Sequence, residues 1–340
     1  MEYKITVISP CYNAENTLKR CVDSIIMQSI GFENIELILY DDGSTDDTRK
    51  IIQDYSNKYK NIVPIFSNSN NGPGFGRDLA ISKSNGEHIM FIDSDDEYEL
   101  TICETLLNEI NDDIDIVSCN YVFIDEDDYS ETIYSSFYKE VKKSVISHDE
   151  LIYLPSFAVW NKIFKKDIII KNNIKFTYIK NGEDELFLKH YLLFSKNFVH
   201  LGSYVGYKHY DRSHSISNSG TVDDLYNFIL VCKKLKEIYE PTGADIPRLL
   251  EGRISLLIGF LYLKDILINY DKKLLYVTLN DLADLEEEIS FNIDLGLLRN
   301  ISNFFIKNRH FTFVIIYSKI LYYLGKSQFI GKIWGSINQK

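Results

Sequence analysis

The sequence G-E-H-I-M-F-I-D-S-D-D, residues 86–96, joins an apolar run to three carboxylates. The apolar run predicts a buried strand from Glu87 to Ile92, and acidic residues follow it directly, at Asp93, Asp95 and Asp96. Two earlier segments are built in the same way: V-I-S-P-C-Y-N at residues 7–13 and L-I-L-Y-D-D-G-S-T at residues 37–45. Strands that end in polar residues predict a sheet with chemistry at one edge, because ligands of open α/β sheets collect beyond the carboxyl ends of the strands.

Helical spacing alternates with these strands over the first hundred residues. We expect helices near residues 14–29, 45–59 and 75–83, and the sequence predicts strands at Lys4–Ser9, Glu36–Tyr40 and Ile62–Phe66 as well as at 87–92. This alternation is typical of βαβ units. It predicts an α/β fold with an open, mostly parallel sheet flanked by helices.

The pattern is looser beyond residue 100. We expect a helix at 102–110, strands at 115–123, 132–138 and 198–210, and helical pieces near residues 149, 167 and 184. From Leu225 onward the spacing is helical, with a break at Pro241-Thr242-Gly243. The sequence therefore predicts a first domain over residues 1–220, with halves at 1–100 and 101–220, and a mainly helical region over residues 221–340.

Composition excludes several classes of protein. The 340 residues are 45% hydrophobic and 25% charged, which is ordinary for a globular protein and unlike a disordered or collagen-like chain. No apolar run approaches the roughly 20 residues of a membrane-spanning helix, and we see no secretory leader pattern at the start. The five cysteines show no C-x-x-C pairing, so we expect reduced thiols and a cytoplasmic location.

Charge is distributed unevenly along the chain. The net charge is −12, but residues 295–340 contain seven Lys or Arg and no Asp or Glu, while the remainder has 30 Lys or Arg against 49 Asp or Glu. Such an acidic body would repel the phosphates of a nucleic-acid duplex, so we expect no nucleic-acid partner. The basic, aromatic segment 299–340 has two interpretations, an interfacial helix peripheral to the inner face of the cell membrane or a helix packed on the protein core.

The pair Asp93 and Asp95 suits a hard divalent cation. Oxygen ligands favour Mg²⁺ or Mn²⁺, and Mg²⁺ is commonly held by one or two carboxylates together with substrate phosphates. An isolated D-x-D triplet is more often a solvated turn than a metal site, so the choice between the two depends on the surrounding sequence. The glycine-rich segment 71–76 lacks the third glycine of G-x-G-x-x-G and follows the wrong strand, which argues against a dinucleotide-binding dehydrogenase.

Four motifs together resemble family 2 glycosyltransferases of the GT-A fold, of the kind that builds bacterial or archaeal cell-surface glycans. They are V-I-S-P-C-Y-N (7–13), L-I-L-Y-D-D-G-S-T-D-D-T (37–48), N-N-G-P-G-F-G-R (70–77) and G-E-H-I-M-F-I-D-S-D-D (86–96). The resemblance is strong over the first hundred residues and weaker to about residue 220. It implies a GT-A, Rossmann-like sheet and metal-dependent transfer of a sugar, with inversion, from a nucleotide-diphosphate donor, in most cases a UDP-sugar.

The resemblance also implies roles for particular residues near the donor. Pro10, through its backbone, and Tyr12 would contact the nucleoside, and Asp42 would accept a hydrogen bond from the base. Arg77 would lie beside the nucleotide. Asp93 would approach the ribose or the metal, and Asp95 would bind Mn²⁺ or Mg²⁺. Asp78 stands where relatives usually have Asn, and we interpret it as an orienting partner of Arg77.

A general base is expected in the segment 182–187, which is similar to the family's G-E-D-x-x-F motif. That similarity implies Asp184 as the base that removes the acceptor hydroxyl proton, with Glu183 as the alternative. The alternative is a purely structural role for Asp184, as the N-cap of a helix. The W-N-K segment 160–162 resembles one found before this motif, so Lys162 would reach the diphosphate or the acceptor, and Trp160 would lie in the core or stack on a sugar.

The segment 207–217 resembles a family loop that closes over the diphosphate. Within it Arg212 would contact the anion, and His209 or His214 would complete the metal ligands, although a surface histidine is the alternative for each.

We therefore expect a glycosyltransferase acting on a glycan or lipid-linked acceptor in cell-surface polysaccharide or glycolipid synthesis. One alternative enzyme is a phosphotransferase of the haloacid-dehalogenase type with Asp93 as nucleophile. That family normally starts with the strand that carries the nucleophile, whereas three strands precede the strand at 87–92 here. A non-catalytic nucleotide-sugar-binding scaffold is the alternative from another class.

Overall fold

The computed structural model describes residues 3–126, 128–134, 144–147, 150, 152–153, 158–177, 179, 182–211, 221–263, 270–291 and 297–325. Several expected features lie outside this part: the helical piece near residue 149, residues 135–138 of one strand, Arg212 and the segment 326–340. The chain divides into two compact units. Unit 1 comprises Met1–Tyr178 and Glu183–Ser215, and unit 2 comprises Ile179–Gly182 and Ile216–Lys340.

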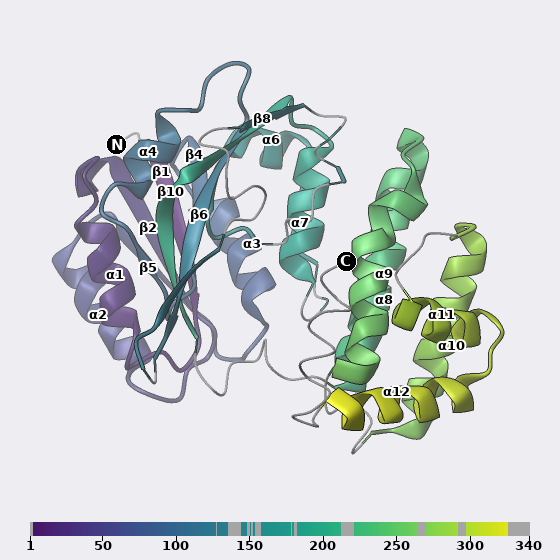
Figure 1. Ribbon diagram of the computed structural model, residues 1–340. Coiled ribbons are helices and arrows are strands. Elements are labelled where there is room, and N and C mark those ends of the chain that lie inside the picture. Colours follow the sequence, from purple (N-terminus) through teal and green to yellow (C-terminus); the bar gives the residue numbers. More distant parts are fainter. Residues whose placement is uncertain are drawn as a thin grey trace. The chain divides into compact units, whose positions relative to one another are not determined.

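Unit 1 contains a mixed sheet whose described strands follow the order β3-β2-β1-β4-β9-β6-β10-β5, with β7 beside β6 and β8 beside β10 (Figure 1). The strands are β1 (Ile5–Cys11), β2 (Ile35–Asp41), β3 (Ile62–Phe66), β4 (His88–Phe91), β5 (Glu97–Tyr98), β6 (Ile116–Asp125), β7 (Glu131–Tyr134), β8 (Ser144–Ser147), β9 (Lys162–Lys165) and β10 (Asn197–Asp211). The first four predicted strands are confirmed and form the parallel half β3-β2-β1-β4.

The second half of the sheet is mixed, because β9 lies antiparallel between β4 and β6. Strand β9 was not expected, since four residues give too short an apolar pattern to separate from the helix that follows. Strands β6 and β10 pair in parallel, so the predicted α/β fold is confirmed although its sheet is less parallel than expected. Strand order reverses between β1 and β4, which places the ends of these two strands at a switch point where such sheets bind ligands.

Helices cover both faces of the sheet of unit 1. Successive side chains of a strand point to opposite faces, and accordingly Val7 and Leu37 belong to one buried cluster while Ile8 and Ile38 belong to the other. Burial on both sides explains the continuous apolar sequence of β1, β2 and β4. The helical elements are α1 (Leu18–Ile26), η1 (Phe32–Asn34), α2 (Thr48–Lys58), α3 (Pro73–Lys83), α4 (Ile102–Leu107), α6 (Lys166–Lys171) and α7 (Glu183–Leu192).

Unit 2 is helical in its described residues, as the spacing after Leu225 predicted. Its elements are α8 (Val222–Tyr239), η3 (Glu240–Thr242), α9 (Ile246–Leu263), α10 (Lys272–Glu288), α11 (Leu297–Lys307) and α12 (Phe311–Gly325). Thr221 and Asp224 form a capping box at the start of α8, and Gly243, at φ 76°, ends the turn at the predicted break. Among the described residues, no helix combines the length and the apolar character needed to cross a membrane.

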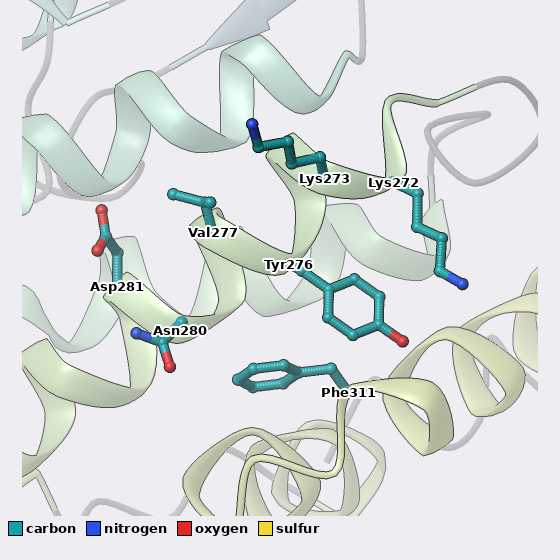
Figure 2. Close-up of a pocket in the computed structure, with 7 residues that line it drawn as sticks. All are labelled: Lys272, Lys273, Tyr276, Val277, Asn280, Asp281 and Phe311. Carbon is teal, nitrogen blue, oxygen red and sulfur yellow. The ribbon is translucent and has the colours of Figure 1, made fainter.

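A shallow cavity of about 690 Å³ lies between α10 and the start of α12 (Figure 2). Tyr276 and Phe311 meet edge to face in it, with ring centroids 5.8 Å apart, and the Tyr276 hydroxyl lies 3.0 Å from the Thr312 hydroxyl. Two lysines, Lys272 and Lys273, line its rim.

Gly76 allows α3 to pack directly on the sheet. A Cβ at this position would lie 2.3 Å from Cδ1 of Tyr40, whose ring is 1% exposed at the end of β2. Because Arg77 and the loop before α3 contribute to the site described below, this close approach fixes their distance from the strand ends.

We predict that Gly76→Ala destabilises the protein by about 1–3 kcal/mol, because the methyl group forces the buried ring or the helix to move. Urea unfolding followed by circular dichroism measures the loss. Gly252→Ala is the matched control, since a Cβ there meets nothing within 4 Å on helix α9 and should stabilise by about 0.5–1 kcal/mol. Equal stability changes in the two variants would contradict the packing role of Gly76.

Candidate active site

The loops that follow β1 and β2 are joined by side-chain to backbone hydrogen bonds. Asn13 adopts a positive φ of 49°, and its Oδ1 accepts from the Thr45 amide at 2.9 Å. In return the Asn13 amide donates to Oγ of Ser44 at 3.0 Å. These bonds keep the polar ends of the two strands together, as the sequence predicted for residues at one edge of the sheet.

Asp42 is buried at the end of β2 and binds the loop that leads into α3. Its two carboxylate oxygens accept from the amides of Asn71, at 2.7 Å, and Gly72, at 2.8 Å. The Tyr40 hydroxyl donates to Oδ1 at 3.1 Å. The side chain proposed for base recognition thus satisfies backbone amides of the N-N-G-P segment, and a nucleobase would share its oxygens with them.

Arg77 connects two carboxylates that lie far apart in the sequence. Its Nη1 donates to Asp184 and its Nη2 donates to Asp93, both at 2.8 Å, and the guanidinium lies 5.3 Å from the centre of the Phe176 ring. The Arg77 side chain is 4% exposed. Burial alone would lower the pKa of Arg77, but Asp184 and Asp93 outweigh it and raise that pKa, so the guanidinium stays charged.

Asp184 lies in the first turn of α7, one residue after the helix begins at Glu183. It is therefore not the N-cap residue, which was the purely structural role considered for it. Burial raises the pKa of Asp184 to about 7, against the lowering effect of Arg77, and Glu183 and Asp93 add to the increase. About a quarter of the side chain, 24%, remains accessible. A carboxylate with these properties can accept a proton near neutral pH.

Asp96 forms a second buried centre that the sequence did not single out. Its Oδ2 accepts from the Tyr207 hydroxyl at 2.5 Å and lies 2.9 Å from Nδ1 of His209, and its Oδ1 accepts from the Tyr210 amide. Burial raises the pKa of Asp96. Burial alone would lower the pKa of His209, but the hydrogen bond with Asp96 raises it to about 8. The only sequence signal was that Asp96 is the last of the acids after β4.

His209 therefore directs Nδ1 at a carboxylate, which leaves Nε2 as the nitrogen for another ligand. Histidines that bind metals commonly have this second hydrogen bond on their other nitrogen. His209 also stacks on Trp160, with centroids 5.9 Å apart, and Trp160 stacks on Tyr207 at 4.2 Å. Tyr121 meets Trp160 edge to face at 4.7 Å. Half-buried Trp160 thus belongs to an aromatic cluster beside the Asp96 centre.

The remaining predicted residues differ in their environments. Tyr12 is 49% exposed, Pro10 pairs with Tyr40 across β1 and β2, and the Asp95 carbonyl accepts from Arg20 at 2.5 Å. The interpretation of Asp78 as a partner of Arg77 is wrong: its Oδ1 accepts from the Phe176 amide at 3.0 Å, and burial raises its pKa to about 6. Among the described residues, no group of three or more His, Cys, Asp or Glu is arranged to hold a metal ion.

Lys162 is fully buried at the start of β9. Its ammonium donates to the Ala158 carbonyl and to Oδ1 of Asn161, both at 2.7 Å. Burial lowers the pKa of Lys162 to about 7, although Cys119 and Asp184 act in the opposite direction. The charged end of a side chain proposed to reach the donor or acceptor is therefore shielded from solvent here.

Comparison with known proteins identifies the family. Residues 6–172 match the family model described as "Glycosyl transferase family 2". GlyG of Streptococcus pneumoniae serotype 4, a glycosyltransferase, is 30% identical over 217 residues, which cover 58% of this chain and 67% of GlyG. The chain belongs to glycosyltransferase family 2. The family match includes Asp42, Arg77, Asp93 and Asp95 but ends before Asp184.

Other relatives of this glycosyltransferase family 2 chain are much longer than the matched stretch. GlyA of Streptococcus pneumoniae serotype 4 is 33% identical over 58% of this chain and 29% of GlyA. The poly(ribitol-phosphate) beta-glucosyltransferase of Bacillus spizizenii is 34% identical over 54% of this chain and 28% of that protein. The chain thus spans less than a third of either relative.

A solved structure of similar fold extends over nearly the whole chain. The crystal structure of S. aureus TarS 1–349 in complex with UDP-GlcNAc has a TM-score of 0.69 and 20% identity, and the match covers 94% of this chain and 90% of the TarS 1–349 chain. The predicted GT-A fold is confirmed by this similarity.

We predict that Lys162→Met changes how stability depends on pH. In the unfolded chain the Lys162 amine binds a proton up to a pKa of ~10.4, but in the folded chain only up to about 7, so the free energy of unfolding of the wild type increases as pH rises between these values. The variant should lack this gain, by at most about 1.4 kcal/mol per pH unit. Urea unfolding at pH 7, 8 and 9 measures it.

Lys171→Met is the control for that experiment, because Lys171 is 73% exposed and pairs with Asp167 four residues earlier. Its free energy of unfolding should differ from the wild type by the same amount at each pH. If the free energies of unfolding of the wild type and Lys162→Met change with pH in parallel, the prediction is contradicted, and the Lys162 amine is accessible to solvent in solution.

Proposed function

We propose that this chain transfers a sugar, with inversion, from a nucleotide-diphosphate donor to a glycan or lipid-linked acceptor of the cell surface. UDP-sugars are the proposed donors. The donor choice is supported by TarS, of similar fold, which was crystallised with UDP-GlcNAc. Transfer to a polymer is supported by a relative that is named a poly(ribitol-phosphate) beta-glucosyltransferase. Family membership supports transfer over the phosphotransferase alternative with Asp93 as nucleophile.

The bridge formed by Arg77 is the observation that supports this proposal most directly. It brings Asp184, which lies beyond the family match, to Asp93 at the end of β4. A transferase needs a base for the acceptor beside the groups that bind the donor, because the two substrates react only when held in contact. One buried guanidinium bonded to both carboxylates supplies that proximity.

Asp184 acts as the general base in this proposal. As the acceptor oxygen forms a bond to the anomeric carbon, the bond from that carbon to the diphosphate oxygen breaks, and the acceptor proton moves to the Asp184 carboxylate. The nucleoside diphosphate leaves. A pKa raised to about 7 by burial makes Asp184 a stronger base than an exposed aspartate. Glu183, the preceding residue, stays the alternative.

A divalent cation, Mn²⁺ or Mg²⁺, would be held by Asp95, Asp93 and His209. Carboxylate oxygens and a histidine with one nitrogen on Asp96 fit such an ion chemically. The described residues contain no ready cluster of three ligands, so diphosphate oxygens of the donor would complete the coordination. When bound, the cation neutralises charge on the leaving diphosphate.

The other donor contacts are proposed from the family motifs: Pro10 and Tyr12 at the nucleoside, Asp42 at the base, and Arg212 at the phosphates. Lys162 would reach the diphosphate or the acceptor only if its buried ammonium left the Ala158 carbonyl and Asn161. For the acceptor, the half-buried rings of Trp160 and Tyr121 offer an aromatic surface beside His209. Aromatic faces suit the apolar face of a sugar ring.

We predict that two substitutions separate binding from catalysis. Asp184→Asn should retain metal-dependent UDP binding and lose transfer by about 10²–10⁴-fold, because it removes the base while the amide oxygen can still accept the hydrogen bond from Arg77. Asp95→Ala should lose the Mn²⁺-dependent part of UDP binding as well. Calorimetry with UDP, with and without Mn²⁺, and assays of transfer and slow donor hydrolysis measure these effects.

Asp54→Asn, an exposed substitution on α2, is the matched control for loss of one negative charge. Equal loss of UDP binding in the Asp184 and Asp95 variants would contradict the assigned roles. UDP-sugar binding by a wild type that neither transfers nor hydrolyses the donor would support the scaffold alternative.

We also predict that Arg77→Lys lowers kcat more than it raises the donor KM. A single ammonium cannot hold two carboxylates with the geometry of a planar guanidinium, so Asp184 and Asp93 would separate. Displacement of about 1 Å can cost about 10²-fold in rate. Steady-state kinetics test this, and an increase confined to the donor KM would instead make Arg77 a donor contact.

A further inference from the structure

Helix α12 presents large apolar side chains to its surroundings. Phe313, Ile316 and Ile320 are 57%, 50% and 51% exposed. Their spacing of three and seven residues places them on one face of the helix, while Val314 and Leu321 are buried. The outer face of a helix in a water-soluble bundle is normally polar, so this face is unusual.

Helix α11 extends the same surface. Phe304 is 60% exposed, and its ring lies 5.7 Å from that of Phe305. The Phe305 ring in turn stacks on Phe313 of α12, with centroids 5.5 Å apart. These contacts join the two helices into one apolar patch, the α11–α12 surface, made of Phe304, Phe305, Phe313, Ile316 and Ile320.

The charges of these two helices all have one sign. Between Leu297 and Gly325 there are four basic residues, Arg299, Lys307, Arg309 and Lys319, and no Asp or Glu. Arg309 pairs with Asp284 at 2.7 Å and lies 3.6 Å from Glu287, and the Lys307 ammonium at the end of α11 donates to the Phe291 carbonyl. The rest of the chain is strongly acidic, so positive charge and exposed apolar side chains coincide here.

We propose that the α11–α12 surface docks on an anionic phospholipid bilayer. Aromatic and aliphatic side chains enter the boundary between headgroups and acyl chains, and lysines and arginines meet the negative headgroups. The acidic remainder of the chain is repelled by the same bilayer, which favours contact through this surface. Two copies of the chain meeting through this surface would instead bring like charges together. The inference goes beyond the proposed transfer reaction and does not depend on it.

We predict that the full-length protein sediments with vesicles of phosphatidylcholine mixed with phosphatidylglycerol, and much less with vesicles of phosphatidylcholine alone. The triple variant Phe313→Ser, Ile316→Ser, Ile320→Ser should reduce vesicle binding about tenfold or more, because insertion of apolar side chains into the bilayer supplies affinity that charge attraction alone does not. All three positions are about half exposed, so the fold should tolerate the changes, and circular dichroism checks this.

Leu256→Ser is the matched control, because Leu256 on α9 is 47% exposed but lies outside the α11–α12 surface. This variant should bind vesicles like the wild type. Three results would overturn the proposal: no sedimentation of the wild type, equal binding to neutral and anionic vesicles, or a wild-type dimer without lipid that the triple variant converts to monomer. The last result would make the surface an interface between copies.

Discussion

The buried guanidinium of Arg77 is the interaction on which the proposed site depends. It holds Asp93, at the end of β4, and Asp184, in the first turn of α7, through hydrogen bonds of 2.8 Å each. Removing one partner of a buried ion pair leaves an uncompensated charge, which is far more costly than loss of an exposed pair. Because separating these charges is costly, the ion pairs hold α7 close to the parallel half of the sheet. Arg77 reaches both carboxylates because Gly76, the residue before it, lets α3 pack close to the strand ends.

The acidic motifs after the strands have a structural role besides any contact with a donor. Asp42 accepts from two consecutive amides of the loop before α3, and Asp41 accepts from the Ser44 amide and from Arg49 at 2.8 Å. Buried backbone amides need partners, and carboxylates supply strong ones. The strand ends are therefore rigid before any ligand arrives, which limits the loss of conformational entropy when a ligand binds.

Local sequence patterns predicted the parallel half of the sheet, the helices between its strands and the helical second unit. The family resemblance assigned Asp93 to the ribose or the metal and Asp184 to the base, and both carboxylates accept from Arg77 in the structure. Contacts between distant segments were not predictable: Asp96 meets His209 across more than a hundred residues, Asp78 binds the Phe176 amide rather than Arg77, and Lys162 turns its ammonium inward. The spacing of apolar residues in one sequence predicts whether a segment is a helix or a strand. It does not predict which helices and strands pack together, and the partner of a side chain depends on that packing.

Two opposing effects determine whether Asp184 can serve as a base. Arg77 stabilises the ionised carboxylate and alone would make it a poor proton acceptor, whereas burial and the nearby charges of Glu183 and Asp93 destabilise it. Burial wins, and the pKa rises to about 7, where a base is ionised often enough to act and basic enough to remove a proton. Arg77, which positions Asp184, therefore also keeps burial from raising the pKa of that carboxyl further. Arg77 thus affects both the position and the basicity of this carboxylate, so a substitution of Arg77 changes the two properties together.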